Sequence, residues 1–218
     1  MNQIIGLDFS IKKPAACIYA NNSYTFLSWP LGLKESLVDS YKDAGVYIID
    51  REVIDTKIQD SSEKMRKDLE NSMYLSELIV NSLASFVDLK QCFIAFEGLS
   101  FGSSGNVILQ LSSYKYILMK AFYDKGVKLS NMFTFAPITI KKAAGCSQKG
   151  MGKKEMIDAF AGSDNDIPFR KFLDTNRLLF QKKGGNWVDH LDDLVDSYFV
   201  IKTFQEKAQL QNVNFNKI

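Results

Sequence analysis

The chain begins with three short segments of apolar and β-branched residues, separated by polar turns. These segments are residues 3–8, 15–20 and 23–29, and Asn21-Asn22 between the last two is typical of a hairpin turn. The spacing predicts a three-stranded meander. Residues 46–50 (VYIID) favour a further short strand, and we expect the rest of 30–60 to be connection.

Two long segments follow in which apolar residues recur at helical spacing. The first covers residues 61–88, and residues 61–63 offer N-cap groups. Its apolar face comprises Leu75, Leu78, Ile79, Ser82, Leu83 and Phe86. The second covers residues 106–125, with a face formed by Val107, Leu111, Tyr114, Leu118 and Ala121.

Strands and helices alternate through the second half of the chain. Residues 92–98 (CFIAFEG) and 132–137 (MFTFAP) predict strands, and Pro137 ends the second. Helices are expected at 138–144 and 153–161, then a short one at 168–180, and a last one from Asp189 to about Gln209. This order predicts an α/β fold in one domain, 1–218, with helices packed on a mixed sheet and an insertion at 162–188.

The composition is that of an ordinary globular protein. Hydrophobic residues make up 46% and charged residues 24%, and the net charge of +2 does not by itself indicate a nucleic-acid partner. Cys17, Cys92 and Cys146 are far apart and form no C-x-x-C motif, which favours buried free thiols over a zinc site or disulfides.

No segment of the sequence suggests a membrane or secretory protein. A signal peptide is not evident, and no apolar stretch reaches the ~18 residues of a membrane span. We therefore expect an intracellular, reducing location. A bacterial, phage or viral cytoplasm is the first choice, and the mitochondrial matrix is the second.

Carboxylates occur at three structured positions. Asp8 ends the first predicted strand, and Glu97 ends the strand at 92–98. In DHLDDLVDSYFVI, one face of the last helix carries Asp189, Asp192, Asp193 and Asp196 at i, i+3, i+4 and i+7. The opposite face is apolar, with Leu191, Leu194, Val195, Tyr198 and Phe199.

An acidic stripe of this kind is usually a solvated surface, and acids also suit the first turn of a helix. However, like charges at i,i+4 cost roughly 0.2–0.5 kcal/mol per pair, and no lysine is interleaved here. A divalent cation would explain the cluster, since hard cations such as Mg²⁺ prefer oxygen ligands. If Asp8 and Glu97 lie at the same sheet edge beside the last helix, together they predict a two-metal site.

Four motifs resemble those of a known family. GLDFS, at Asp8, resembles the opening motif of the ribonuclease H-like superfamily. FEGLSFGSSGN, from Glu97 to Asn106, resembles the second motif of RuvC-type Holliday junction resolvases. APITIKKAAG followed by GKKEM resembles the family's lysine-bearing loop. DDLVDS is similar to the closing motif of the mitochondrial and poxvirus branch.

The resemblance implies a ribonuclease H-like fold, with a mixed five-stranded sheet flanked by helices. It also implies a Mg²⁺-dependent endodeoxyribonuclease that acts as a homodimer on four-way DNA junctions in recombination and repair. Mn²⁺ would substitute for the two Mg²⁺ ions. The implied metal ligands are Asp8, Glu97, Asp193 and Asp196, with Asp192 as the alternative to Asp193. Two regions, 30–60 and 162–188, have no counterpart, and His190 is either a metal ligand or an exposed residue.

Lysines gather where a nuclease would hold DNA. Between 141 and 160 there are five lysines against two acids, beside Gly150 and Gly152, and lysines on such loops suit phosphate contacts. They are Lys141, Lys142, Lys149, Lys153 and Lys154, and the family pattern implies that Lys153 acts at the scissile phosphate. Lys182 and Lys183 would extend the patch. A solvated loop is the alternative.

Two further DNA contacts are conceivable just after Glu97. Phe101 is a candidate wedge at the junction crossover, although a packing role is also open. Asn106, like Ser103 and Ser104, is either a phosphate contact or a helix cap.

Other functions remain open from the sequence. An actin-like ATPase also begins with G-x-D, but it needs two similar halves. A flap or RNA–DNA hybrid nuclease is nearer, and a non-catalytic junction-binding protein would keep the fold without the chemistry. His190 is the one histidine of the chain, so a Ser-His-Asp triad has no support beyond it.

Overall fold

The computed structural model describes residues 3–52, 60–99, 105–163, 166–188 and 190–210. Within them, six strands form one mixed sheet in the order β4-β3-β2-β1-β5-β6. The strands are β1 (Gln3–Asp8), β2 (Ala15–Ala20), β3 (Ser23–Ser28), β4 (Val46–Ile48), β5 (Cys92–Glu97) and β6 (Met132–Phe135). The five-stranded expectation is therefore corrected to six, and the short edge strand β4 accounts for the difference.

The first three strands form the predicted meander. Antiparallel pairs join β1 to β2 and β2 to β3. Asn21 and Asn22 turn the chain between β2 and β3 with φ of 51° and 62°, the left-handed conformation that tight hairpin turns require and that asparagine tolerates. This turn and the alternation of apolar residues explain why the sequence predicts the meander correctly.

Two helical segments differ from their predicted bounds. Helix α1 (Glu35–Asp43) lies in the region expected to be connection, and it was missed because Tyr41 is its one fully buried side chain. Helix α2 (Ser61–Ala84) ends before 88, so Phe86 lies beyond it and is 39% exposed. Asp60, not Ser61 or Ser62, caps α2 through the backbone N–H of Glu63.

The remaining helices follow the expected order. They are α3 (Gly105–Asp124), α4 (Pro137–Ala143), α5 (Lys153–Ala161), α6 (Pro168–Thr175) and α7 (Leu191–Leu210). Pro137, expected to end a strand, is the first residue of α4, where its missing N–H costs nothing. The helix expected at 168–180 divides into α6 and the 3₁₀ helix Arg177–Phe180.

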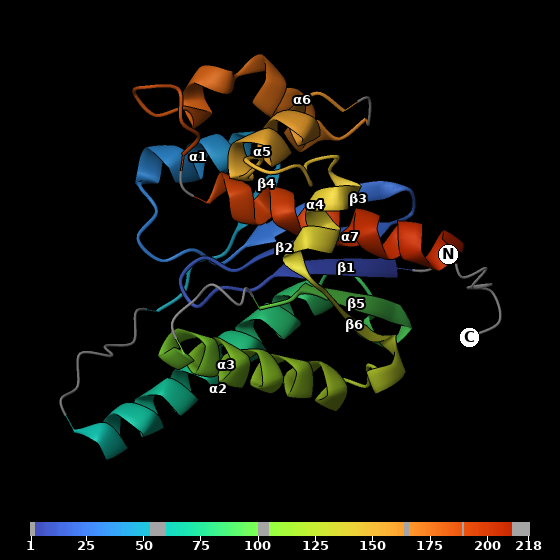
Figure 1. Cartoon of the computed structure of the whole chain (residues 1–218). Coiled ribbons are helices and arrows are strands. Elements are labelled where there is room, and N and C mark those ends of the chain that lie inside the picture. Colours follow the sequence, from blue (N-terminus) through green and yellow to red (C-terminus); the bar gives the residue numbers. More distant parts are fainter. Residues whose placement is uncertain (1–2, 53–59, 100–104, 164–165, 189, 211–218) are drawn as a thin grey trace.

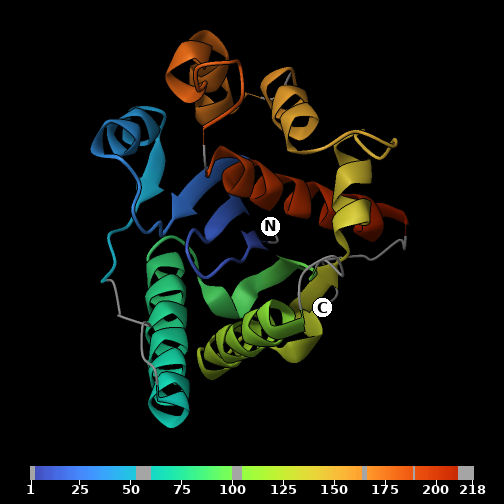
Figure 2. The same cartoon turned by 60° about the vertical axis from the view of Figure 1, so that its left-hand side comes forward.

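The helices cover the two faces of the sheet (Figures 1 and 2). Helices α2 and α3 pack on one face, and α7 lies across the other with α4 and α5 beside it. Each face has its own apolar core. Phe169, Leu173, Phe180 and Trp187, from the region 162–188, join the core on the α7 side. The interpretation of this region as an insertion in a single domain stays a prediction.

The three cysteines are buried and free, as predicted. No helix among the described residues has both the length and the apolarity that crossing a membrane requires.

Candidate metal centre and nucleic-acid interface

Asp8 and Glu97 lie side by side at one edge of the sheet. Strands β1 and β5 run parallel, and their register pairs Leu7 with Phe96. The residue after each of these is the acid, so both strands deliver a carboxylate to the same edge. The condition that the sequence analysis set for a metal site is met in this geometry.

A glycine allows the third acid to approach. A Cβ atom on Gly6 would overlap the backbone carbonyl oxygen of Ser197 and lie 2.8 Å from Ile201 Cγ1. Helix α7 therefore crosses β1 at close range only because residue 6 has no side chain. This contact holds the first turns of α7 against the end of β1, where Asp8 lies.

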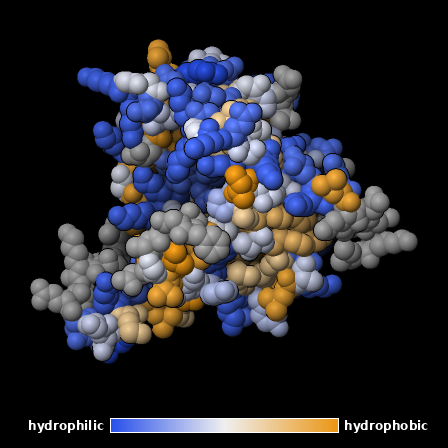
Figure 3. All heavy atoms as spheres, in the orientation of Figure 1, coloured by the Kyte–Doolittle hydropathy of each residue, from blue (hydrophilic) through white to orange (hydrophobic). Residues whose placement is uncertain are grey.

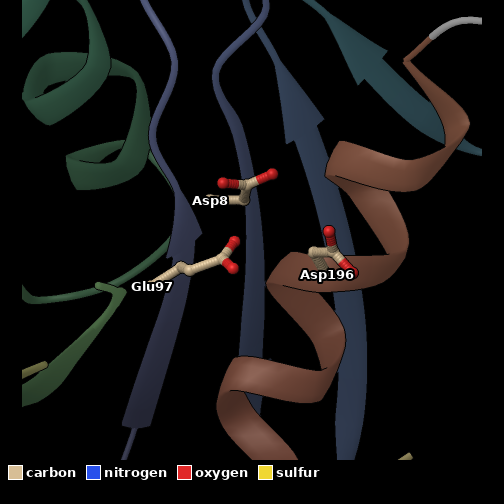
Figure 4. Close-up of side chains that lie close together, drawn as sticks. All are labelled: Asp8, Glu97 and Asp196. Carbon is tan, nitrogen blue, oxygen red and sulfur yellow. The ribbon is translucent and has the colours of Figure 1, made fainter. Parts of the chain in front are cut away.

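The three acids Asp8, Glu97 and Asp196 converge (Figure 4). One carboxylate oxygen from each lies within 4.8 Å of the other two. They come from β1, β5 and α7, which are far apart in the sequence. Together with Asp193, Lys153 and Lys115, they line a cavity of about 240 Å³.

Burial and mutual repulsion raise the pKa values of this cluster. Burial raises the pKa of Asp8 well above its usual range, and the charges of Glu97 and Asp193 raise it further. The pKa of Asp196 is raised by burial and then by Glu97. The pKa of Glu97 is also raised by burial, although a hydrogen bond with Asp8 opposes the shift. The folded protein thus gathers carboxylates whose mutual repulsion favours the binding of either protons or a cation.

The donor set fits a hard divalent cation. Carboxylate oxygens are what Mg²⁺ and Mn²⁺ take as ligands, and a cation would offset the repulsion that raises these pKa values. The residues Asp8, Glu97 and Asp196 are therefore those that could hold it, with Asp193 at the rim of the same cavity.

Two more aspartates of the acidic stripe, Asp192 and Asp193, are held by protein partners. Asp192 forms an ion pair with Lys153. Asp193 Oδ2 lies 2.9 Å from His190 Nδ1. Of the two, Asp193 lines the cavity with the three converging acids. The choice between Asp193 and Asp192 as a metal ligand stays a proposal, and the geometry favours Asp193.

His190 links α7 to the sheet. Its side chain is buried, with Nδ1 on Asp193 and Nε2 hydrogen-bonded to Ser28 Oγ at the end of β3. Both ring nitrogens therefore have protein partners, and the expectation of an exposed histidine is wrong.

The backbone at His190 takes an unusual conformation to allow these contacts. Its φ is 82°, a region that a residue with a Cβ adopts only when the surroundings fix it. Ser28, which is fully buried, was missed by the sequence analysis, because a serine at the end of a strand gives no signal of its own.

Lys115 is a second residue that the sequence analysis missed. It sits on the buried side of α3, its Nζ donates a hydrogen bond to the backbone carbonyl of Glu97 at 2.7 Å, and it lies 5.3 Å from the centroid of the Phe96 ring. Burial lowers its pKa to about 8, although the charges of Glu97 and Asp8 oppose the shift. A lysine between Tyr114 and Leu118 on an apolar helix face was the available signal.

Among the predicted phosphate-binding lysines, Lys153 is the one that lines the acidic cavity. It begins α5 and pairs with Asp192. Burial alone would lower its pKa, but the pair with Asp192 and the charges of Asp193 and Asp196 raise it overall. It therefore stays positively charged beside the acids.

The other predicted phosphate-binding lysines lie farther along the same region. Lys141 and Lys142 are in α4, Lys149 is in the following loop, and Lys154 is the second residue of α5. Lys142, Lys149 and Lys154 are exposed, whereas Lys141 is half-buried and its Nζ lies 3.5 Å from the carbonyl of Met151. Lys182 and Lys183 are exposed beyond the 3₁₀ helix Arg177–Phe180.

Some predicted residues lie outside the described part of the chain. Phe101, Ser103, Ser104 and Asp189 are among them. Asn106 belongs to the first turn of α3, but the description does not extend to its side chain. Their proposed roles stay predictions.

No protein-family model matches the sequence, and no curated protein matches it. Among solved structures, the chain is similar to Thermus thermophilus RuvC in complex with a Holliday junction substrate, with 13% identity and a TM-score of 0.52 over 95% of this chain and 96% of that one. A further structure of RuvC from this organism gives 11% identity and a TM-score of 0.50, over 94% and 96%. The likeness confirms the predicted architecture: the chain has the ribonuclease H-like fold of RuvC.

Proposed function

We propose that this protein is a metal-dependent endonuclease that resolves four-way DNA junctions by paired hydrolysis of phosphodiester bonds. The observation that carries the proposal is the convergence of Asp8, Glu97 and Asp196 from three separate elements, with carboxylate oxygens within 4.8 Å of one another. The fold shared with RuvC supports the same activity. Such an activity would serve DNA recombination and repair.

The acids would bind two Mg²⁺ ions, or Mn²⁺ in their place. Asp8, Glu97 and Asp196 would hold the ions, together with Asp193 from the same cavity. The bound ions would supply Lewis acidity to activate water and to stabilise the leaving oxygen. The raised pKa values of Asp8 and Asp196 support this assignment, because a cation would replace the protons that the cluster otherwise favours.

The chain's own cations would hold the DNA strand. Lys153 lines the acidic cavity, and we propose that its ammonium group stabilises charge on a phosphate there. Lys141, Lys142, Lys149 and Lys154 would bind neighbouring backbone phosphates without reading the sequence. Lys115 would keep the end of β5 in place through the Glu97 carbonyl.

Paired cleavage requires two active sites, so we propose a homodimer. Apolar side chains gather on the surface of α3 and beside it (Figure 3). Val107 is 46%, Leu109 67%, Tyr116 71% and Leu129 64% exposed, next to a largely apolar groove of about 410 Å³. A surface of this kind on a water-exposed helix favours a protein partner, and a second copy would place two acidic clusters on one junction.

Sedimentation of a Leu109→Glu variant would test the dimer. We expect the wild-type chain to sediment as a dimer and the variant as a monomer. Leu178→Glu is the matched control, because Leu178 is 86% exposed but lies in the 3₁₀ helix Arg177–Phe180, away from α3. A wild-type monomer, or equal effects of the two changes, would exclude this interface.

The activity itself is tested by cleavage of labelled synthetic substrates: a four-way junction, a linear duplex, a flap and an RNA–DNA hybrid, each with Mg²⁺ and with EDTA. Paired symmetric nicks on the junction alone, lost in EDTA, would support the proposal. Cleavage of the flap or hybrid instead would assign another substrate to the same fold. Junction binding without cleavage of any substrate would indicate a non-catalytic binding protein.

A further inference from the structure

A second cavity, which we name the Arg51 pocket, lies on the neighbouring side of α3 and has a volume of about 340 Å³. Its walls come from the loop after β1, the segment after β4, and helices α2 and α3. The side chains that give it its chemistry are Arg51, Asp68, Asn71, Tyr74, Gln110 and Tyr114. Neither the acidic cluster nor the predicted lysines contribute to it.

Arg51 supplies unused hydrogen-bond donors. Its Nη2 donates to the carbonyls of Ile11 at 2.6 Å and Lys12 at 2.8 Å. Its Nε is buried without a hydrogen-bond partner, and in the part of the chain that the structure describes no carboxylate forms an ion pair with it. Burial lowers its pKa to about 10. A buried donor left unpaired costs the folded state roughly 1–3 kcal/mol. The guanidinium of Arg51 also lines the pocket, where its positive charge favours acceptor atoms of a ligand.

The other walls favour a neutral planar ligand over a phosphate. Asp68 and Glu52 line the pocket and would repel an anion. Asp68 Oδ1 accepts from Gln110 Nε2 at 3.2 Å, and the amide of Asn71 is nearby. Amide, carboxylate and guanidinium groups are those that read the edges of nucleobases, and the partly exposed ring of Tyr74 offers a surface on which a base can stack.

The Arg51 pocket is next to the acidic cavity along two segments of the chain. On α3, Leu111 and Lys115 line the acidic cavity, and the adjacent residues Gln110 and Tyr114 line the pocket. At the end of β1, Asp8 lines the acidic cavity, and three residues later Ile11 lines the Arg51 pocket. Three residues of chain span at most roughly 11 Å, which equals about three stacked nucleotide steps of one strand.

We propose that the Arg51 pocket receives one unpaired nucleobase of the cleaved strand, within about three nucleotides of the phosphate at the acidic cluster. The inference rests on the proposed function and deepens it. Arg51 would donate to acceptor atoms on the edge of the base, and Asn71 and Asp68 would contact its remaining polar atoms. The pocket would thereby give the enzyme a base preference near the cut.

The test is a scan of junctions in which each base near the mapped cut is replaced in turn by an abasic site. For the wild-type protein we expect one position where the loss of the base slows cleavage about tenfold, the effect of a lost base-edge contact. In an Asn71→Leu variant the same replacement should have at most a twofold effect, since the contact is already missing. Asn81→Leu, an exposed residue of the same helix outside the pocket, should behave as the wild type does.

The outcomes separate the two proposals. Junctions that are cut at the same rate whichever base is removed would show that the pocket does not bind a base. The same conclusion would follow if Asn71→Leu loses as much cleavage rate at the same abasic position as the wild type, and after either result the nuclease proposal would stand. If the wild-type chain cuts no junction under any metal condition, both proposals fall. Gln110→Leu repeats the comparison from α3, so that a folding defect in one variant does not decide the result.

Discussion

The His190 imidazole and the Asp193 carboxylate form a hydrogen-bonded pair, with Nδ1 2.9 Å from Oδ2. The other ring nitrogen bonds Ser28 on the sheet. The pair therefore fixes the first turn of α7 relative to β3 and sets the direction of a carboxylate at the rim of the acidic cavity. Histidine–carboxylate contacts of this type orient metal ligands in other metalloproteins.

We predict that His190→Ala weakens Mn²⁺ binding by about 10- to 100-fold, the usual effect of removing a residue that orients a ligand. His190→Gln, which can still donate to Asp193, should recover part of the affinity. Calorimetric titration with Mn²⁺ measures both, and circular dichroism checks that each variant is folded. Unchanged affinity in a folded His190→Ala protein would exclude an orienting role.

Without metal, the protein should lose stability as pH rises. The folded state holds protons at Asp8 and Asp196 more tightly than the unfolded state does, because their pKa values are raised. More protons bound in the folded state means that the free energy of unfolding falls with pH, starting near the unfolded pKa of about 4. Thermal melts in EDTA from pH 4 upward should show this fall, and saturating Mg²⁺ should reduce it. A melting temperature in EDTA that rises over this range would contradict the assignment.

Gly6→Ala should destabilise the fold and misplace the acids. The new Cβ would overlap the Ser197 carbonyl oxygen, and overpacking of this kind costs about 1–3 kcal/mol. Gly105→Ala is the matched control, since a Cβ there meets no atom within 4 Å and should change stability by less than about 0.5 kcal/mol. Urea unfolding gives both values, and equal stabilities would show that α7 does not depend on Gly6.

Lys153→Ala should slow junction cleavage by about 100-fold, because one preorganised charge at a reacting group is worth that much. Lys154→Ala, the adjacent exposed lysine outside the acidic cavity, should affect cleavage only through a small loss of DNA affinity. Single-turnover rates at saturating protein separate cleavage from binding. Equal effects of the two changes on the single-turnover rate would show that Lys153 only contacts the DNA backbone and does not act in cleavage.

Sequence patterns predicted the elements whose signals are local. The strand ends that carry Asp8 and Glu97, the Asn21-Asn22 turn and the two faces of α7 all follow from periodicity and turn chemistry. Helix α1 was missed because it buries little, and the division near Asn176 was missed because nothing in the local pattern ends a helix there.

The contacts that complete the candidate site are not local. Ser28 lies 162 positions from His190, and Lys115 contacts Glu97 across 18. The Arg51 pocket joins the loops after β1 and β4 to α2 and α3, so no sequence window contains it. Such pairings depend on sheet order and helix placement, which a single sequence does not specify.

The most direct test of the account is cleavage of a four-way junction by Asp8→Asn, which removes one charge from the acidic cluster and little volume. We predict that gel-shift affinity for the junction is kept while Mg²⁺-dependent nicking falls by more than about 100-fold, and that Asp39→Asn, on the exposed side of α1, nicks as the wild type does. Nicking by Asp8→Asn at the wild-type rate would show that the converging carboxylates are not the catalytic centre.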